Sequence, residues 1–204
     1  QPRRPGEPLR VVFVSRVSPM KNLDYALDVI AASRVPLTFD IYGMVDDPSY
    51  WKRCQEIISR IPEHVRVAYH GPLPPEQVGT TLAGHDLLLL PTRGENYGHV
   101  IAESMTQGTP VLISDRTPWR GLEHAGVGWD LPLESPARGF VDALESLAGM
   151  EPAAYGEMRR RVAAYGESRL GSPQSREANR DLLRAACGRT AGLDAAPTCE
   201  PVVK

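Results

Sequence analysis

Short apolar runs alternate along the chain with segments whose apolar positions recur at helical spacing. The run at 86–90 (DLLLL) is typical of a strand covered on both faces, because its apolar residues are continuous rather than alternating. Asn22 can cap a helix in which Leu23, Leu27 and Ile30 share one face. The alternation predicts an α/β fold. Six strands are expected, at residues 11–15, 37–42, 65–69, 86–90, 110–113 and 129–131.

Helices are expected between and after these strands. Pro74 favours a helix start, where the missing N–H of proline does no harm, and Gly108 favours a helix end. Residues 188–204 contain few large apolar side chains and predict a disordered tail. After the helix that begins at Asn22, the expected helices cover residues 48–61, 74–82, 98–107, 118–124, 136–149, 152–168 and 174–187.

Repeated strand–helix units with short connections imply right-handed crossovers and a parallel, Rossmann-like sheet of about six strands with helices on both faces. In such sheets ligands bind beyond the carboxyl ends of the strands. This rule selects the loops at residues 15–22, 43–47, 70–75, 91–98 and 114–119.

The charge balance excludes some partners. The chain has 204 residues, with 23 Lys and Arg against 25 Asp and Glu, and its net charge is −2. This gives no reason to expect nucleic acid or an anionic membrane as the main partner. A local basic site for one phosphorylated ligand remains compatible with it.

Cysteine usage and the chain ends add context. Cys54, Cys187 and Cys199 are far apart and odd in number, which favours free thiols in a reducing, cytoplasmic compartment over disulfides or a zinc site. No apolar run approaches the roughly 20 residues that span a bilayer. The opening QPRRPGEP lacks the apolar core of a signal peptide, and residues 1–8 are interpreted as a linker from a preceding domain.

Three groups could hold a phosphate. Arg16 and Lys21 follow the first strand, and two cations there can grip a diphosphate. Gly98, His99 and Val100 would present backbone N–H groups at a helix start, which is a natural anion site. The alternatives are two solvated surface charges and an ordinary helix start.

Two acids bracket the stretch at residues 95–103 (ENYGHVIAE). Glu95 lies in the loop before the helix, where a ligand would bind. Glu103 lies within the helix, beside apolar Ala102 and Met105. A buried carboxylate without donors costs several kcal/mol, roughly, so Glu103 must find partners. Either a structural salt bridge or the paired hydroxyls of a ribose could supply them.

Other chemistry has little support. His70, His85, His99 and His124 show no metal-ligand spacing, so no metal is expected. The sequence lacks G-x-G-x-x-G after the first strand, a P-loop and a G-x-S-x-G elbow. Asp115, at the end of the fifth strand, is interpreted as a cap for the helix that follows it, with a functional role as the alternative.

The motifs in this order resemble the C-terminal, donor-binding domain of GT-B glycosyltransferases, in particular retaining family 4 (glycosyl transferases group 1). The resemblance covers roughly residues 9–170 and is densest at 91–115, where Glu95 and Glu103 form an E-x7-E pair. The matching segments are VVFVSRVSPMKN (11–22), IYG (41–43), YHGPLPPEQV (69–78) and PTRGENYGHVIAESMTQGTPVLISD (91–115). The departures are mild: Ser15 for Gly, Tyr97 for Phe, and Ser104 for Ala. The Tyr97 hydroxyl needs a partner if it is buried.

The resemblance implies a role for each matching residue. Arg16 and Lys21 would hold the nucleotide diphosphate, Glu103 the ribose, and Glu95 the transferred sugar. The substrate-binding set would also include Asn96, Tyr97, Gly98, His99 and Val100 near the distal phosphate, and Gly43, His70, Gly71 and Leu73 near the base.

The resemblance also implies the activity. Residues 9–187 would bind a UDP- or GDP-linked sugar without a cofactor or metal. The sugar would pass with retention to an unidentified glycan or lipid-linked glycan held by an N-terminal domain, and residues 1–204 alone would be inactive. Peripheral membrane association of the longer protein is left open. Two alternatives are a nucleotide-sugar 2-epimerase and a non-catalytic nucleotide-sugar-binding module.

Overall fold

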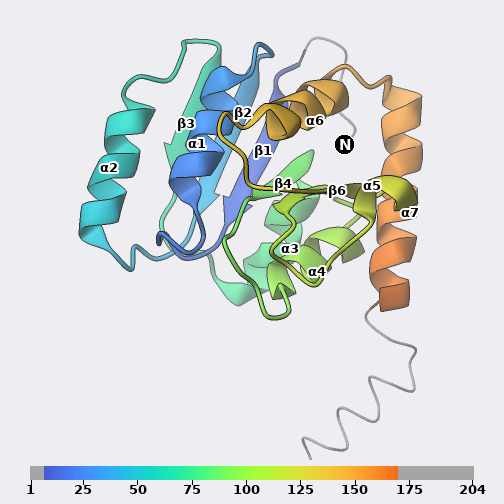
Figure 1. The fold of residues 1–204 in the computed structure, drawn as a ribbon. Coiled ribbons are helices and arrows are strands. Elements are labelled where there is room, and N and C mark those ends of the chain that lie inside the picture. Colours follow the sequence, from blue (N-terminus) through green and yellow to red (C-terminus); the bar gives the residue numbers. More distant parts are fainter. Residues whose placement is uncertain (1–6, 170–204) are drawn as a thin grey trace, which may run out of the picture. The chain divides into compact units, whose positions relative to one another are not determined.

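The computed structural model describes residues 7–169 (Figure 1). Within them, six parallel strands form one sheet in the order β3-β2-β1-β4-β5-β6, which confirms the predicted Rossmann-like fold. The order reverses between β1 and β4, and this is where open α/β sheets bind ligands. The strands are β1 (Leu9–Val14), β2 (Leu37–Tyr42), β3 (Val65–Tyr69), β4 (Leu87–Leu90), β5 (Val111–Ser114) and β6 (Gly128–Leu131).

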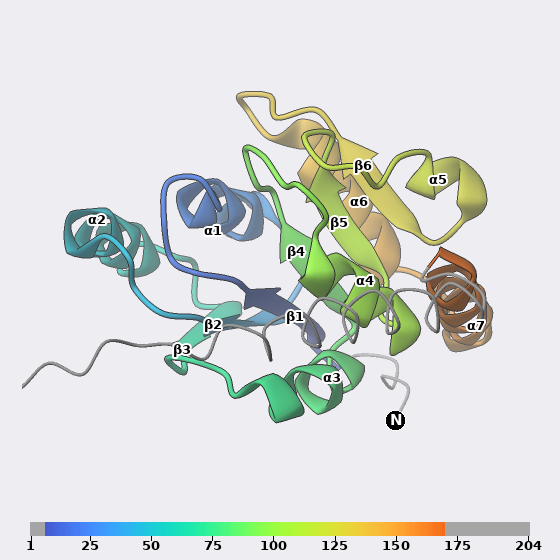
Figure 2. The same cartoon turned by 90° about the horizontal axis from the view of Figure 1, so that it is seen from below.

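Helices cover both faces of the sheet. Figure 2 shows α1, α2 and α6 on one face and α3, α4 and α7 on the other, with α5 beside β6. The helices are α1 (Leu23–Ala32), α2 (Pro48–Ile58), α3 (Pro75–Ala83), α4 (His99–Thr106), α5 (Leu122–Ala125), α6 (Arg138–Ala148) and α7 (Pro152–Arg169). None of these helices is long and apolar enough to cross a bilayer.

The central strands form the core. All residues of β4 and β5 are buried, as the continuous leucine run predicts. The Cys54 thiol on α2 is buried and unpaired, and burial raises its pKa to about 11.

Four helices, α2, α4, α5 and α6, are shorter than the sequence predicts. The helix predicted to end at residue 61 ends at Ile58, because Arg60 and Ile61 donate to carbonyls only three residues back. The helix predicted from residue 118 begins at Leu122. The predicted helix at 174–187 and the tail at 188–204 lie outside the described residues.

The interpretation of Asp115 as a helix cap is wrong. Gly121 and Leu122 at the start of α5 donate to the carboxylate of Asp130 on β6, at 3.1 and 2.8 Å. Asp115 lies beside Arg116, with 3.2 Å between its Oδ1 and Nε. A sequence pattern cannot show that a later strand brings the capping carboxylate back.

A buried polar network ties α7 to the sheet. Arg10 on β1 forms an ion pair with Asp86, and Tyr155 on α7 donates to the Asp86 carbonyl at 3.0 Å. Tyr155 is 6% exposed. Burial, reinforced by the Asp86 charge, raises the pKa of its phenol to about 12.

Replacing Tyr155 by phenylalanine tests this network. At pH 7, Tyr155→Phe is expected to lower the free energy of unfolding by about 1 kcal/mol through loss of the hydrogen bond. A raised folded pKa stabilises the protein below the unfolded pKa of about 10, and this contribution disappears as pH rises toward the folded pKa. The difference between wild type and Y155F in urea unfolding should therefore shrink at alkaline pH. Parallel pH profiles would contradict this; Tyr165→Phe on the same helix is the control.

Candidate functional site

Two loops at the carboxyl ends of neighbouring strands are joined by hydrogen bonds. Met20 lies in the loop after β1, and its carbonyl accepts from the Arg93 amide at 2.8 Å and the Thr92 hydroxyl at 3.1 Å, in the loop after β4. The Asn22 side chain donates to the Pro91 carbonyl at 2.9 Å and accepts from Arg93 Nε at 3.1 Å. We call this set of contacts the loop seam.

Asn22 acts differently from the prediction. It occupies the residue before α1, but its side chain makes no cap hydrogen bond. It is buried, and its backbone is left-handed with φ 61°, a conformation that Asn tolerates better than most residues. Because both ends of its amide are used across the loop seam, Asn22 joins the loops instead of capping the helix.

Asn22→Gly is expected to lower the free energy of unfolding by about 1–2 kcal/mol, because glycine keeps the left-handed backbone but leaves buried Pro91 oxygen without its donor. Urea unfolding measures this change. Asn96→Ala, in the exposed part of the loop after β4, serves as the control and is expected to change stability by less than about 0.5 kcal/mol. Equal losses in both variants would show that the loop seam contributes nothing specific.

Lys21 and Glu95 meet across the loop seam. Their side chains form an ion pair and are only 14% and 18% exposed. The Glu95 amide donates to the Arg116 carbonyl at 3.2 Å, which adds the loop after β5 to the same assembly. The structure thus brings together two of the predicted site residues, at the point where the strand order reverses.

Arg16 lies in the same loop as Lys21, but it pairs toward β2, on the opposite side of β1 from Glu95. Its guanidinium lies 2.7 Å from Asp46 in the loop after β2, and its side chain is 67% exposed. Val17 and Val45 form an isolated parallel bridge that holds these two loops together. Each predicted phosphate-binding cation is therefore paired with a carboxylate of a different neighbouring loop.

The loops predicted to hold the base contact one another. The Gly43 amide donates to the Gly71 carbonyl at 2.8 Å, and the Tyr69 hydroxyl donates to the Gly43 carbonyl at 2.9 Å. Gly43 has φ 149°, and a Cβ there would lie 1.8 Å from the Ser15 carbonyl oxygen, so only glycine fits. Leu73 follows in the same connection as Gly71.

A carboxylate shared by two histidines supports the loop after β3. Asp40 lies 2.6 Å from His70 Nε2 and 3.1 Å from His85 Nε2, and the His70 ring stacks on Tyr42 at 4.6 Å between centroids. Burial alone would raise the pKa of the Asp40 carboxyl, but its hydrogen bonds with both histidines outweigh burial and hold that pKa below its usual value. Sequence reasoning missed this cluster; its one signal was an acid inside the apolar strand LTFDIY.

The start of α4 has the expected geometry. Gly98 precedes the helix in the left-handed region with φ 78°, and its carbonyl accepts from the amides of Ile101 and Ala102 at 2.9 and 3.1 Å. An α-helix leaves its first N–H groups without intrahelical partners, which applies to the amides of Gly98, His99 and Val100. Of these residues, His99 is exposed, Val100 is half-buried and Gly98 is buried.

Glu103 has no ion pair within residues 7–169, so the salt-bridge alternative is wrong for this part of the chain. Its neighbours Ala102 and Met105 are buried, while Glu103 itself is half-buried. Its Oε1 would lie 3.8 Å from a Cβ placed on Gly79 of α3. Glu103 thus keeps a carboxylate available on the α3 side of α4.

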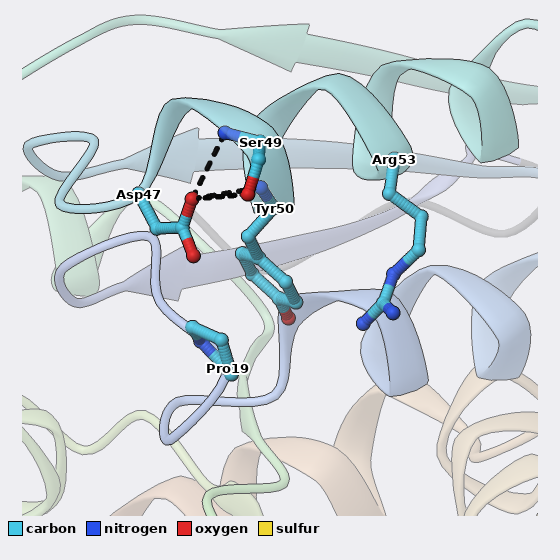
Figure 3. A pocket seen from close by; sticks show the side chains of 5 residues that line it. All are labelled: Pro19, Asp47, Ser49, Tyr50 and Arg53. Carbon is cyan, nitrogen blue, oxygen red and sulfur yellow. Dashed lines mark hydrogen bonds between the residues drawn. The ribbon is translucent and has the colours of Figure 1, made fainter.

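A separate pocket of about 250 Å³ lies between the loop after β1 and the start of α2 (Figure 3). Asp47 turns back to accept from the amides of Ser49 and Tyr50, so this helix start is already capped and offers no anion site. The Tyr50 hydroxyl and the Arg53 guanidinium both bond the carboxylate of Asp24, at 2.7 Å each. The polar side chains of this pocket thus bond either one another or Asp24 beside them.

The strand order, the reversal between β1 and β4, and the residues at that edge define a Rossmann-like domain of the type that forms one half of a GT-B fold. The chain belongs to the glycosyl transferases group 1 family, whose model matches residues 1–169.

Two curated relatives illustrate the sequence similarity. The D-inositol 3-phosphate glycosyltransferase of Nocardia farcinica is 33% identical over 156 residues, which cover 71% of this chain and 34% of that protein. An uncharacterised 41.2 kDa protein in the cps region of Klebsiella pneumoniae is 29% identical over 110 residues, covering 53% and 28%. The chain therefore spans about a third of the length of these relatives.

Solved structures share the fold. Anabaena HepE in complex with UDP-glucose aligns with a TM-score of 0.70 and 19% identity, over 87% of this chain and 49% of HepE. The C-terminal domain of LpcC, a glycosyl transferase group 1 family protein from Francisella tularensis, aligns with a TM-score of 0.62 and 14% identity, over 78% and 82%. The second alignment covers most of an isolated C-terminal domain.

Proposed function

We propose that this chain is the donor-binding half of a retaining, family 4 glycosyltransferase. The observation that carries the proposal is the Lys21–Glu95 pair at the loop seam, with Glu95 shortly before the first amides of α4 in the chain. A cation, a carboxylate and a helix start at one point suit the diphosphate and sugar of a nucleotide-sugar donor. Membership of glycosyl transferases group 1 supports the same assignment.

On donor binding, the diphosphate takes the place of the two carboxylates that hold the cations. Lys21 turns from Glu95 to the diphosphate, and Arg16 turns from Asp46. As the bond between the anomeric carbon and the distal phosphate oxygen breaks, negative charge develops on the leaving diphosphate. An acceptor hydroxyl oxygen forms the new bond to the anomeric carbon on the same face, and the hydroxyl proton passes to the diphosphate. Arg16, Lys21 and the α4 amides stabilise that charge without a metal ion, while Glu95 orients the sugar hydroxyls and Glu103 binds the ribose.

The acceptor is held by an N-terminal domain, and the sugar is transferred in the cleft between the two domains. The acceptor is a glycan or lipid-linked glycan. We assign UDP as the preferred nucleotide, since HepE was crystallised with UDP-glucose and with UDP. A cytoplasmic location fits the free, buried thiol of Cys54.

Calorimetry of the 204-residue chain with UDP, GDP and ADP tests donor binding, and a transfer assay of the full-length protein tests turnover. UDP is expected to bind most tightly, and transfer is expected to persist in EDTA. Formation of free UDP and ManNAc from UDP-GlcNAc without acceptor would instead identify a 2-epimerase. Binding without turnover in every acceptor screen would identify a non-catalytic module, and transfer by residues 1–204 alone would contradict the two-domain proposal.

A further inference from the structure

An aromatic pocket lies beside the start of α4. It is lined by Tyr97, Pro118, Trp119 and Arg169 and has a volume of about 160 Å³. Tyr97 belongs to the loop after β4, Pro118 and Trp119 to the loop after β5, and Arg169 to the end of α7. We call these four residues the aromatic shelf.

The shelf is held in place by a hydrogen bond. Trp119 is 7% exposed, and its indole Nε1 donates to the Tyr97 carbonyl at 2.6 Å. The Tyr97 and Trp119 rings meet edge to face at 6.3 Å, and the His99 ring lies 4.7 Å from Tyr97. The aromatic surface is therefore formed before any ligand arrives.

Tyr97 is one of the exposed large apolar residues in the part of the chain that the structure describes. Its side chain is 42% exposed, and its hydroxyl has no hydrogen-bond partner within residues 7–169. Because Tyr97 is exposed, its hydroxyl does not need the hydrogen-bond partner that a buried tyrosine at this position would require. A large ring that is fixed in place and partly open to water, with a free hydroxyl at its tip, is suited to a ligand that is apolar on one face and polar at its edge.

The size and position of the shelf restrict the ligand. The pocket is smaller than the roughly 300 Å³ that drug-sized ligands require and much larger than the ~30 Å³ of one water, so it suits a single ring. The shelf follows β4 and β5, whereas the loops assigned to the base follow β2 and β3, on the far side of β1. A nucleobase bound at those loops is thus separated from the shelf by the assigned diphosphate site.

We propose that the aromatic shelf binds one sugar ring of the acceptor glycan. The C–H face of a pyranose packs on Tyr97 and Pro118, and its edge hydroxyls bond the Tyr97 hydroxyl and the Arg169 guanidinium. The proposal rests on the proposed function, because it takes Glu95 and the α4 amides as the donor sugar site, directly before the shelf. It adds a contact to the acceptor from the donor-binding domain.

Titration of the ¹⁵N-labelled 204-residue chain tests the proposal. The probes are the methyl glycosides of glucose, galactose, mannose and N-acetylglucosamine, and the signal is the Trp119 indole N–H, assigned with Trp119→Phe among the three tryptophans. At least one glycoside is expected to shift it. Tyr97→Phe loses the hydroxyl contact but keeps the flat ring, so it should weaken binding less than Tyr97→Leu, which is apolar but not flat and should weaken it by roughly 2- to 10-fold.

UDP binding separates this proposal from the proposed function. The wild-type chain is expected to bind UDP whether or not the shelf binds a glycoside, because the proposed diphosphate site uses Lys21 and backbone amides rather than the Trp119 indole. Normal UDP binding with no glycoside shift at Trp119, or equal glycoside affinity in Y97F and Y97L, would overturn the shelf alone. Loss of UDP binding in the wild-type chain would overturn both.

Discussion

Replacing Lys21 by methionine is expected to lower the kcat of glycosyl transfer in the full-length enzyme by about 10²- to 10³-fold. The pair with Glu95 holds the cation at the loop seam, and from there Lys21 turns to the leaving diphosphate on which charge develops. Removal of one group that stabilises such charge typically costs a factor of this size. Steady-state assays with saturating donor measure the effect.

The Lys21 variant needs a structural control. Methionine leaves the Glu95 carboxylate, which is 18% exposed, without its cation, so Lys21→Met is expected to lower stability as well. The double variant Lys21→Met with Glu95→Gln should regain stability but not kcat. Recovery of kcat in the double variant would show that the loss was structural. Lys52→Met removes an exposed cation on α2 and should leave kcat unchanged.

Replacing Glu103 by glutamine is expected to raise the Kd for UDP by about 10- to 100-fold. Glu103 has no ion pair within residues 7–169, so its carboxylate remains available for two ribose hydroxyls. Hydrogen bonds to a charged group are worth about 1.5–3 kcal/mol, which sets the size of the effect. Calorimetry of the 204-residue chain measures it.

A modified nucleotide identifies the contact. The wild-type chain should bind 2′-deoxy-UDP more weakly than UDP, and Glu103→Gln should reduce that difference, because the carboxylate that distinguishes the two is gone. An unchanged ratio between the two nucleotides would place Glu103 away from the ribose. Glu56→Gln, at an exposed position on α2, is the matched control and should leave both affinities unchanged.

The elements of the fold were predictable because local pattern and burial agree. β2 and β3 have the predicted bounds, and the leucine run of β4 is buried on both faces. The helix starting after Gly98 follows from the glycine and the apolar spacing beyond it. The end of α2 was less predictable, because Ile57, Ile58 and Ile61 continue an apolar stripe that the sheet only partly covers.

The contacts of the site were less predictable than its members. Lys21 and Glu95 were both candidates, but their pairing depends on how two loops 74 residues apart meet. Asn22 is a residue type that often caps helices, yet its side-chain amide donates to the carbonyl of Pro91 instead. The cluster around Asp40 could not be predicted from its position within a strand, because the two histidines that bond it come from later loops.

Gly43 has a consequence for engineering the loops that are proposed to bind the base of the donor. Its backbone passes so close to Ser15 that any side chain at position 43 would collide with the end of β1. Segments transplanted from relatives can therefore change residues 44–47 and 72–77, but they must retain this glycine and its spacing. Redesign of nucleotide selectivity at these loops therefore has to change side chains and keep the backbone conformation at Gly43.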